Sequence, residues 1–588
     1  GEKVTSENAW RDYPRPQMER ANWTCLNGDW DYAITAITNT PGRPEKWDGK
    51  IRVPFALEAP LSGCGGRLLE PDEYLWYTRT IDLDPKPGER ILLHFGAVDF
   101  RAIVYLGHDE VALHEGGQLP FTADLTPFAK KGANTLTVLV WDPTEDFIQS
   151  RGKQAFKTHA CFYTRSSGIV QTVWLETVPE AHIADYDVTT DIDKGEVTLT
   201  IRGTGNREQG TVEILCGSAP LRETFTPGEP VAIRLPRPVA LWSPEHPYLY
   251  AMEIVLNGKG KELDAVKAYT ALRSCTEVID ADGYKRLGLN GKPYFQYGPL
   301  DQGWWPDGLY TAPTDEALAF DIEKTKQWGF NLIRKHIKVE PARWYWHCDR
   351  LGMLVWQDMP SIADNIGGND ANPQWGQFGY DTGWDYPLSE SAKATYYKEW
   401  GEIIGQLKKH PSIVVWVPFN EAWAQFDTEK AVDFTREQDP SRLINSASGG
   451  NSRMCGDILD SHNYPRPIMK FRSGGAQIDV LGEYGGIGYA VDGHLWQADN
   501  NWGYRGLCKD GEEVLEKYRH YAIEEFIPQV KSGVSAGIYT QTTDVEVEVN
   551  GIMTYDRAVV KMDEEKLRSV NLQVRETVRQ VCIRATGL

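Results

Sequence analysis

The chain has 588 residues, several times the usual domain size of about 100 to 200, so its length predicts two to four domains. It has 62 Lys and Arg against 83 Asp and Glu, and the formal net charge of −21 argues against nucleic acid or an acidic membrane surface as a partner. No apolar run approaches the roughly 20 residues that cross a bilayer. The composition therefore predicts a soluble protein with a neutral ligand.

The chain starts at Gly1 rather than at a methionine, without a charged and then apolar leader. We interpret this start as the result of a removed segment, either a secretion signal or a tag. A periplasmic or secreted location is slightly favoured over a cytoplasmic one. The nine cysteines, from Cys25 to Cys582, are scattered without CxxC pairs, which predicts mostly free and buried thiols. The sequence leaves open whether the chain forms a homo-oligomer.

The first half of the chain has the pattern of β structure. Residues 33–179 show short alternating stretches, such as 91–95 and 135–141, broken by Gly, Pro, Asn and Asp. This pattern predicts an all-β sandwich. Residues 182–273 form a second β stretch of about 90 residues, a length that suits an immunoglobulin-like sandwich.

After about residue 284, helical periodicity alternates with short apolar strands, which is typical of βα units. Eight strands are predicted, at residues 294–297, 331–334, 353–357, 413–419, 443–446, 458–462, 480–483 and 536–541. Helices fit between most of them. Thr314 suits the N-cap of a helix over residues 315–328, and residues 512–526 have one apolar face. Eight strands in about 300 residues predict a (β/α)8 barrel.

Two carboxylates follow strands at the end that forms the active face of such a barrel. Glu421 follows the apolar fourth strand, and Glu483 ends the seventh. Tips of these two strands can direct side chains into one pocket. Two facing carboxylates are the minimum set for glycoside hydrolysis, in which one protonates the leaving oxygen and the other attacks the sugar carbon or activates water. The alternative is that each Glu lies on the surface or caps a loop. For Glu421 this alternative is weaker, because the apolar strand before it directs it to the mouth of the barrel.

Residues 414–423, VVWVPFNEAW, resemble the acid/base motif of glycoside hydrolase family 2, which contains β-galactosidases, β-glucuronidases and β-mannosidases. The resemblance covers nearly the whole chain. Segments similar to the family's two N-terminal modules are residues 13–16 (YPRP), 26–30 (LNGDW), 76–77 (WY), 95–99 (FGAVD), 168–174 (GIVQTVW) and 241–250 (LWSPEHPYLY). The resemblance implies a jelly-roll sandwich of sugar-binding type over residues 1–180, an immunoglobulin-like sandwich over 181–274 and a catalytic barrel over 275–588.

The resemblance also implies roles for five residues. Glu421 is expected to be the general acid/base and Glu483, within LGEYGG, the nucleophile of a retaining double displacement. Asn420 is expected to bind the sugar 2-hydroxyl, Arg334 to orient and ionise the nucleophile, and Tyr464 to donate to it. The alternatives are a turn cap for Asn420 and a structural ion pair for Arg334.

Four further residues are candidates for binding the sugar. His462 ends strand six and Asp301 follows strand one, but a structural histidine and a turn-capping aspartate are equally compatible with these positions. His336 is one place out of register with a histidine of the family. Trp502 lies in one of two long segments near this face, where aromatic rings can stack on sugars. The other aromatic candidates there are Trp375, Phe378, Trp384, Trp496 and Tyr504.

Departures from the family pattern bear on the sugar. The Asn-x-Lys pair with which β-glucuronidases bind a uronic carboxylate is not evident, and the acidic segment 544–550 found there is expected to repel a uronide. Strand eight also lacks the tryptophan that family members often present. Terminal β-galactosides, cleaved in exo fashion from an oligosaccharide or polysaccharide-derived glycoside, are therefore the lead substrates. β-Mannosides, β-glucuronides and α-L-arabinosides are alternatives.

A non-catalytic carbohydrate-binding or scaffolding protein is the rival class, because a fold can persist without turnover. The presence of Glu421, Asn420, Glu483 and Arg334 speaks against it. The expected reaction needs no redox cofactor, and no ligand cluster in the sequence demands a metal ion.

Overall fold

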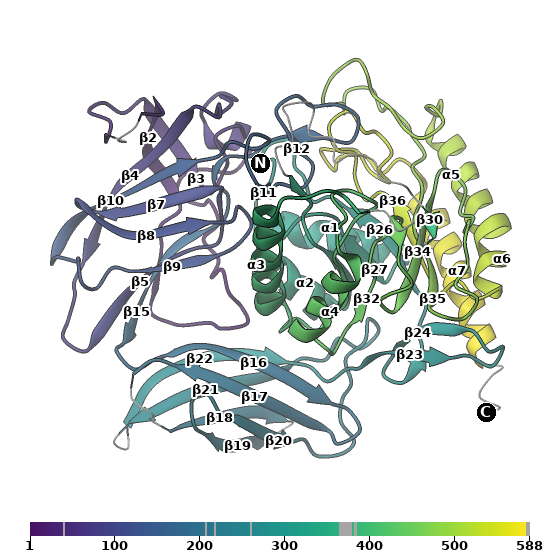
Figure 1. Cartoon of the computed structure of the whole chain (residues 1–588), viewed down its shortest axis with the longest axis horizontal. Helices are drawn as coiled ribbons and strands as arrows, with labels where there is room; N and C mark the ends of the chain where they lie inside the picture. Colours follow the sequence, from purple (N-terminus) through teal and green to yellow (C-terminus); the bar gives the residue numbers. More distant parts are fainter. Residues whose placement is uncertain are drawn as a thin grey trace.

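The computed structural model describes residues 1–38, 42–205, 209–216, 219–258, 261–363, 379–380 and 385–583. The predicted fold class is confirmed: two β-sandwiches accompany a parallel eight-stranded barrel. In Figure 1 the first sandwich lies at the left, the second below, and the barrel at the right.

The first sandwich contains a six-stranded and a four-stranded sheet. The larger sheet has the order β3 (Gly49–Val53), β2 (Gly28–Ala36), β4 (Glu73–Leu83), β10 (Gly132–Trp141), β7 (Arg101–Leu106), β8 (Asp109–Glu115). The smaller has the order β1 (Trp23–Cys25), β15 (Val173–Pro179), β5 (Glu89–Phe95), β9 (Phe121–Asp124). Because side chains alternate along a strand, Leu136, Val138 and Val140 of β10 all enter one core, which they share with Phe95 of the other sheet.

The second sandwich packs a three-stranded sheet on a four-stranded one. The first has the order β16 (Ile183–Asp191), β17 (Glu196–Gly203), β20 (Pro230–Arg234). The second has the order β19 (Ala219–Phe225), β18 (Gly210–Cys216), β21 (Tyr250–Gly258), β22 (Lys261–Thr270). Alternate residues of both sheets, such as Leu199 and Ile254, form its separate core.

All eight predicted barrel strands are present, with shifted ends. Their spatial order is β32 (Leu443–Ile444), β31 (Ile413–Val417), β28 (Leu354–Asp358), β27 (Leu332–Lys335), β26 (Gln296–Asp301), β36 (Ala536–Thr540), β35 (Ile478–Gly485), β34 (Ile458–Asn463). A bridge between Asn445 and Ile458 joins the two ends of this row and closes the barrel. A small sheet of β23 (Cys275–Ile279), β24 (Lys285–Leu289) and β25 (Lys292–Pro293) lies against the amino ends of the strands, where Arg286 donates to the Val534 carbonyl.

Helices surround the barrel. They are α1 (Asp315–Gln327), α2 (Ala342–Leu351), α3 (Glu390–Leu407), α4 (Thr428–Gln438), α5 (Gly511–Arg519), α6 (Ile527–Lys531) and α7 (Glu564–Ile583). Thr314 caps α1 as predicted, since its hydroxyl accepts from the Ala317 amide. The helix predicted over residues 512–526 is α5 followed by a π-helical stretch at His520–Phe526.

One segment of the first sandwich, residues 149–165, is built into the mouth of the barrel. Its strand β11 (Gln149–Ser150) pairs with β29 (Ile362–Ala363) of the barrel, and both β11 and β12 (Gln154–Ala155) lie beside the barrel in Figure 1. Phe162 stacks on Trp423 with ring centroids 5.4 Å apart. The first sandwich therefore contributes side chains to the barrel mouth.

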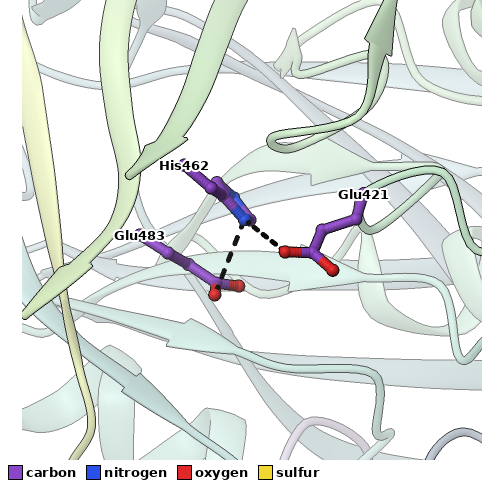
Figure 2. A group of neighbouring side chains, drawn as sticks. All are labelled: Glu421, His462 and Glu483. Carbon is purple, nitrogen blue, oxygen red and sulfur yellow. Dashed lines mark hydrogen bonds and ion pairs between the residues drawn. The ribbon is translucent and has the colours of Figure 1, made fainter. Parts of the chain in front are cut away.

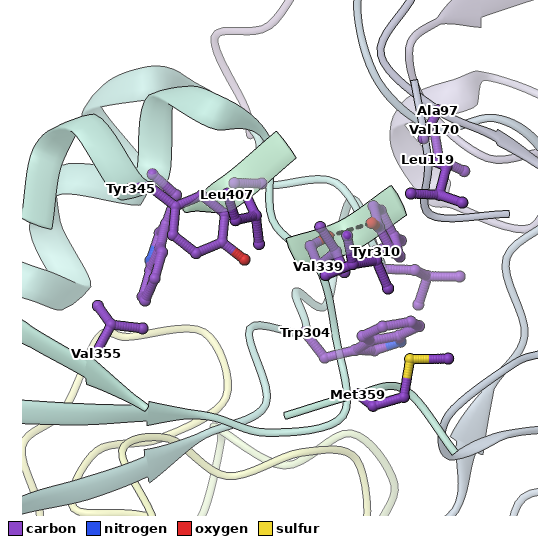
Figure 3. Packing of buried hydrophobic residues seen from close by; sticks show 14 of the residues in the cluster. Ala97, Leu119, Val170, Trp304, Tyr310, Val339, Tyr345, Val355, Met359 and Leu407 are labelled. Carbon is purple, nitrogen blue, oxygen red and sulfur yellow. Dashed lines mark hydrogen bonds between the residues drawn. The ribbon is translucent and has the colours of Figure 1, made fainter. Parts of the chain in front are cut away.

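A continuous hydrophobic core supports this junction. Figure 3 shows Ala97, Leu119 and Val170 of the sandwich near Trp304, Tyr310 and Val339 of the barrel. All belong to one buried cluster that also reaches the strand residue Val355. The two domains are thus fixed to each other by burial of apolar surface.

Two simpler predictions can also be compared with the structure. No helix among the described residues is long and apolar enough to cross a membrane. The eight cysteines whose side chains are described are free, as predicted, but only Cys348 and Cys508 among them are buried. The predicted burial is wrong for the others, which are partly exposed.

Gly152 tests how tightly the segment 149–165 is fixed to the barrel. It has φ +64°, and a Cβ there would lie 2.7 Å from the Ile337 carbonyl oxygen; Gly107 has φ +62° with nothing within 4 Å. Replacing either by Ala costs about 1 kcal/mol for the left-handed backbone. We expect Gly152→Ala to lose about 1 to 3 kcal/mol more, because the backbone of Ile337 cannot move away cheaply. Thermal unfolding measures both, and equal falls in Tm would show that the contact is loose.

Candidate active site

Glu421, His462 and Glu483 converge at the mouth of the barrel, as Figure 2 shows. Glu483 lies in β35, His462 in β34 and Glu421 in the turn after β31. One oxygen of each carboxylate and one ring nitrogen of His462 all lie within 4.8 Å of one another. The fold therefore brings together the two carboxylates that the strand positions singled out.

Glu421 is oriented by an unusual backbone conformation rather than by its strand. β31 ends at Val417, earlier than predicted. Glu421 has φ 52°, which a residue other than glycine rarely adopts, and its amide donates to the Ser448 carbonyl at 2.6 Å. A Cβ at position 450 would lie 2.0 Å from the Glu421 carbonyl oxygen, so Gly450 makes room for this turn.

A β-bulge orients Glu483. The pairing of β34 with β35 shifts between Asp460 and His462, so that His462 faces Glu483. The Gly482 amide donates to Asp460 Oδ1 at 2.6 Å, and a Cβ on Gly482 would lie 1.9 Å from Asp460 Oδ2. Only glycine fits this approach, which explains the residue before Glu483.

His462 lies between the two carboxylates. Its Nδ1 is 3.1 Å from Glu421 Oε1 and 3.5 Å from Glu483 Oε2. Its Nε2 is 2.9 Å from Ser448 Oγ, which in turn donates to Asp460 Oδ2 at 2.6 Å. Since the single hydroxyl hydrogen of Ser448 goes to a carboxylate, Nε2 donates to Ser448. Nδ1 is then the nitrogen that shares a proton with the two carboxylates.

The charges of this group stabilise one another. Burial acts to raise the pKa of Glu483, but His462 and Arg334 outweigh it and hold the pKa below its ordinary value. Burial acts to lower the pKa of His462, but Glu483 and Glu421 hold it above its ordinary value. Glu483 is therefore ionised, and His462 favours the imidazolium form.

Arg334, in β27, is fully buried and donates to three side chains at once. Nη1 donates to Glu483 Oε1 at 2.8 Å and Nη2 to Asn420 Oδ1 at 2.8 Å. Nε and Nη2 also form a fork with the carboxylate of Asp358 at 3.1 and 2.9 Å. Because arginine only donates, Asn420 presents its oxygen to Arg334, and its Nδ2 group is left for another acceptor.

Three aromatic rings form a wall beside Glu483. Tyr464 donates to Glu483 Oε2 at 2.5 Å, and its ring stacks on Tyr504 with centroids 3.7 Å apart. Trp502 meets Tyr504 edge-on, and its Nε1 donates to the Ala160 carbonyl of the segment 149–165. Trp502 therefore links this wall to the first sandwich. Of the other aromatic candidates, Trp496 packs against Tyr555. Trp375, Phe378 and Trp384 lie outside the described residues.

Asp301 and His336 are engaged by protein contacts. Asp301 accepts from Lys335 Nζ at 2.7 Å and from the Gly303 amide at 3.0 Å, which favours the turn-capping alternative over a sugar contact. His336 Nδ1 lies 3.0 Å from Asp358 Oδ2. Burial and the charge of Lys153 hold the pKa of His336 well below its ordinary value, so the neutral ring donates to Asp358.

Glu421, His462 and Glu483 also form a group whose ligand atoms could hold a metal ion, the one such group in the described part of the chain. The charges of the two carboxylates are already compensated, since His462 approaches both and Arg334 pairs with Glu483. The arrangement therefore does not require a metal ion.

A cavity of about 680 Å³ adjoins this group and is lined by Glu421, His462 and Tyr464. Two cationic side chains, Lys470 and Arg505, also line it. The residues that line the cavity include Glu421 but not Glu483.

Three domain models of one family match the chain in order. The sugar-binding domain of glycosyl hydrolases family 2 matches residues 67–179, a second family 2 model matches 181–273, and the family 2 TIM barrel domain matches 311–471. Together they cover more than half of the chain. The chain belongs to glycosyl hydrolase family 2.

Family 2 relatives carry two kinds of name. A putative beta-glucuronidase of Formosa agariphila is 26% identical over 541 residues, which are 88% of this chain and 58% of that protein. The beta-galactosidase large subunit of Leuconostoc lactis is 26% identical over 428 residues, which are 68% of this chain and 62% of that protein. The chain thus spans less than two thirds of the length of these relatives.

Solved structures share the fold. The beta-D-glucuronidase of Dictyoglomus thermophilum matches with a TM-score of 0.73 at 18% identity, over 95% of this chain and 98% of that chain. A family 2 beta-galacturonidase from Eisenbergiella tayi, bound to galacturonate, matches with a TM-score of 0.67 at 19% identity, over 96% of this chain and 99% of that chain.

Three residues of this family 2 site were missed by the sequence analysis. Asp358 is the last residue of β28, and Arg334 lies near the end of β27. The rule that selects residues at strand ends could therefore have found Asp358. Ser448 and Asp460, which hold His462, carry no such signal. Ser448 follows a strand of only two residues, and Asp460 is inside β34.

The raised pKa of His462 makes its contribution to stability depend on pH. A group with a raised pKa in the folded state stabilises most below its unfolded pKa, here about 6.5, and loses this effect as the pH rises through the folded value. We expect the difference in Tm between the native protein and His462→Gln to be largest near pH 5.5 and to shrink towards pH 9. His108→Gln, in an exposed turn, is the control. A difference that grows with pH would contradict the imidazolium assignment.

Proposed function

We propose that this chain is a retaining β-glycosidase that removes terminal sugars from oligosaccharides or polysaccharide-derived glycosides. Glu483 attacks the anomeric carbon and forms a covalent glycosyl ester, while Glu421 donates its proton to the departing glycosidic oxygen. Glu421 then takes a proton from water, and the water oxygen displaces Glu483 from the anomeric carbon. The released sugar keeps the β configuration.

The short separation of the two carboxylates carries this proposal. Their nearest oxygens lie within 4.8 Å. Retaining enzymes place the two carboxyl groups about 5 to 5.5 Å apart, whereas inverting enzymes need about 6.5 to 9.5 Å to admit a water molecule. The ionised state of Glu483 supports its role as the nucleophile, because only the carboxylate attacks.

The neighbours of Glu483 support the same reaction. Arg334 and Tyr464 each hold one of its oxygens, which limits rotation of the carboxylate before attack. Arg334 occupies Oδ1 of Asn420, so that Nδ2 remains to donate to a sugar 2-hydroxyl as charge develops in the transition state. His462 contacts both carboxylates and can balance their charge as the proton on Glu421 leaves and returns.

The sugar is a finer question. β-Galactosides are the lead from the sequence, and the name of the Leuconostoc lactis relative supports them. β-Glucuronides are the second candidate, supported by the name of the Formosa agariphila relative. A panel of aryl β-galactoside, β-glucoside, β-mannoside, β-glucuronide and α-L-arabinoside separates these candidates.

Substitution of the two carboxylates tests the mechanism. We expect Glu483→Gln to lower kcat/KM at least about 1,000-fold on the best aryl glycoside, because no covalent intermediate can form. We expect Glu421→Gln to lower it about 100- to 10,000-fold, and added azide to restore turnover, because azide attacks the intermediate without a general base. Glu525→Gln, which alters an exposed pair with Arg466, is the control.

The outcomes distinguish the alternatives. Nuclear magnetic resonance of the first product should show the β-anomer of the sugar. An α-anomer would mean an inverting enzyme, and full activity in Glu483→Gln would remove Glu483 from the mechanism. Sugar binding by a protein that cleaves no glycoside in the panel would favour a non-catalytic role.

A further inference from the structure

Lys153 enters the barrel mouth from the first sandwich. It lies in the segment 149–165, and its Nζ is 5.5 Å from the centroid of the Trp423 ring. Trp423 follows Glu421 by two residues, so Lys153 approaches the proposed site from the side of the acid/base. The side chain is almost entirely enclosed, with 6% of the residue exposed.

Among the described residues, no anion is in contact with the ammonium of Lys153. In the part of the chain that the structure describes, no carboxylate lies within 4.0 Å of Nζ and no group forms a hydrogen bond with it. The other buried lysines described differ in this respect. Lys335 pairs with Asp301 at 2.7 Å, Lys338 with Glu340 at 2.9 Å and Lys561 with Asp544 at 2.6 Å.

An enclosed ammonium without a partner is costly, which is why buried lysines are nearly always paired. The charge of Lys153 acts on Glu483 and on Glu548, and it lowers the pKa of the first while opposing the burial that raises the pKa of the second. Both carboxylates lie beyond contact distance. The cation therefore lies beside Trp423 and within electrostatic reach of the nucleophile Glu483, next to which the reacting sugar would lie.

The acidic segment that follows β36 does not oppose an anion in the way the sequence suggested. Asp544 is neutralised by Lys561. Glu546 accepts from the Thr164 amide at 2.9 Å. Glu548 accepts from Gln302 at 3.2 Å and from Asn550 at 3.1 Å, and burial raises its pKa. The fold thus pairs one of these carboxylates with a cation and gives the other two hydrogen-bond donors, which weakens the repulsion expected for a uronide.

We propose that Lys153 binds a carboxylate carried by the sugar beside Glu483, so that the preferred substrates are β-linked uronides. This assignment rests on the proposed function, since it concerns the sugar of the same reaction. It replaces the neutral ligand expected from the net charge of −21, because a single enclosed cation outweighs distant surface charge that salt screens. The competing interpretation is that Lys153 donates to hydroxyls of a neutral sugar.

Two matched pairs of aryl glycosides separate these interpretations. The pairs are β-galactoside with β-galacturonide, and β-glucoside with β-glucuronide, and the members of each pair differ only in a hydroxymethyl or carboxylate group at C5. The full chain is assayed with Lys153→Met, which keeps the length and removes the charge, and with Lys153→Arg. Lys157→Met, an exposed lysine of the same segment, is the matched control.

We expect the native chain to cleave at least one uronide about 100-fold better, by kcat/KM, than its neutral partner. Lys153→Met should lose about 100-fold on that uronide, the loss typical when one member of a buried charge pair is removed, and less than about fivefold on the neutral sugar. Lys153→Arg should keep part of the preference. The free uronic acid should inhibit the native chain but not Lys153→Met, and thermal unfolding should show that each variant is folded.

Three other outcomes overturn the assignment. Cleavage of the neutral sugars alone, abolished by Glu483→Gln, would refute the role of Lys153 while leaving the proposed glycosidase intact. An equal loss on both members of a pair in Lys153→Met would mean that Lys153 acts on Glu483 rather than on the substrate. If the native chain cleaves no glycoside of either pair, or if Glu483→Gln leaves cleavage unchanged, the proposed function is refuted and the assignment with it.

Discussion

The guanidinium of Arg334 is the interaction on which the site depends. It is fully buried, and it connects three strand ends by donating to Glu483, Asn420 and Asp358 at the same time. Burying a charge is favourable only when its donors are satisfied, and here the partners supply both charge and geometry. Burial raises the pKa of Asp358 to about 6, and Arg334 opposes this rise, so the same contact that orients Glu483 also keeps its neighbour ionised. Removing Arg334 would leave Asp358 without its ion-pair partner and Glu483 with His462 as its nearest cationic neighbour.

Backbone conformation around Arg334 also determines where the two carboxylates lie. Glu421 accepts a left-handed conformation, and Gly450 and Gly482 allow approaches to Glu421 and Asp460 that a Cβ would block. The strain at Glu421 costs on the order of 1 to 3 kcal/mol and persists because its amide is fixed to Ser448. Both carboxylates are therefore placed by main-chain constraints, and His462 only has to occupy the space between them.

The sequence predicted the parts of this arrangement that follow from periodicity. Eight apolar strands could be counted, and strand ends singled out Glu421 and Glu483 because the barrel brings such ends together. Arg334 was named from the resemblance to family 2. Contacts between distant segments could not be predicted in this way. The sequence made Asp301 a candidate for sugar binding, whereas the structure pairs it with Lys335. Asp544 was expected to repel a uronide because the sequence does not reveal its pairing with Lys561, which is 17 residues further on. Lys153 lies in the first sandwich, outside the barrel, so the position of barrel strand ends could not have singled it out.

The junction of the first sandwich with the barrel brings residues of two domains to the proposed active site. The groups proposed for bond cleavage all come from the barrel. Lys153 comes from the segment 149–165 of the first sandwich, as does Ala160, whose carbonyl accepts from Trp502. This segment is fixed to the barrel by the pairing of β11, by the stacking of Phe162 on Trp423 and by a shared apolar core. A barrel without this sandwich would keep Arg334, Glu421 and Glu483 but lose the cation that we propose for substrate selection. In this proposal, bond cleavage and sugar selection reside on different domains, so a substitution in the segment 149–165 is expected to alter selection while cleavage is preserved. This separation also explains why motifs within the barrel identified the family without identifying the sugar.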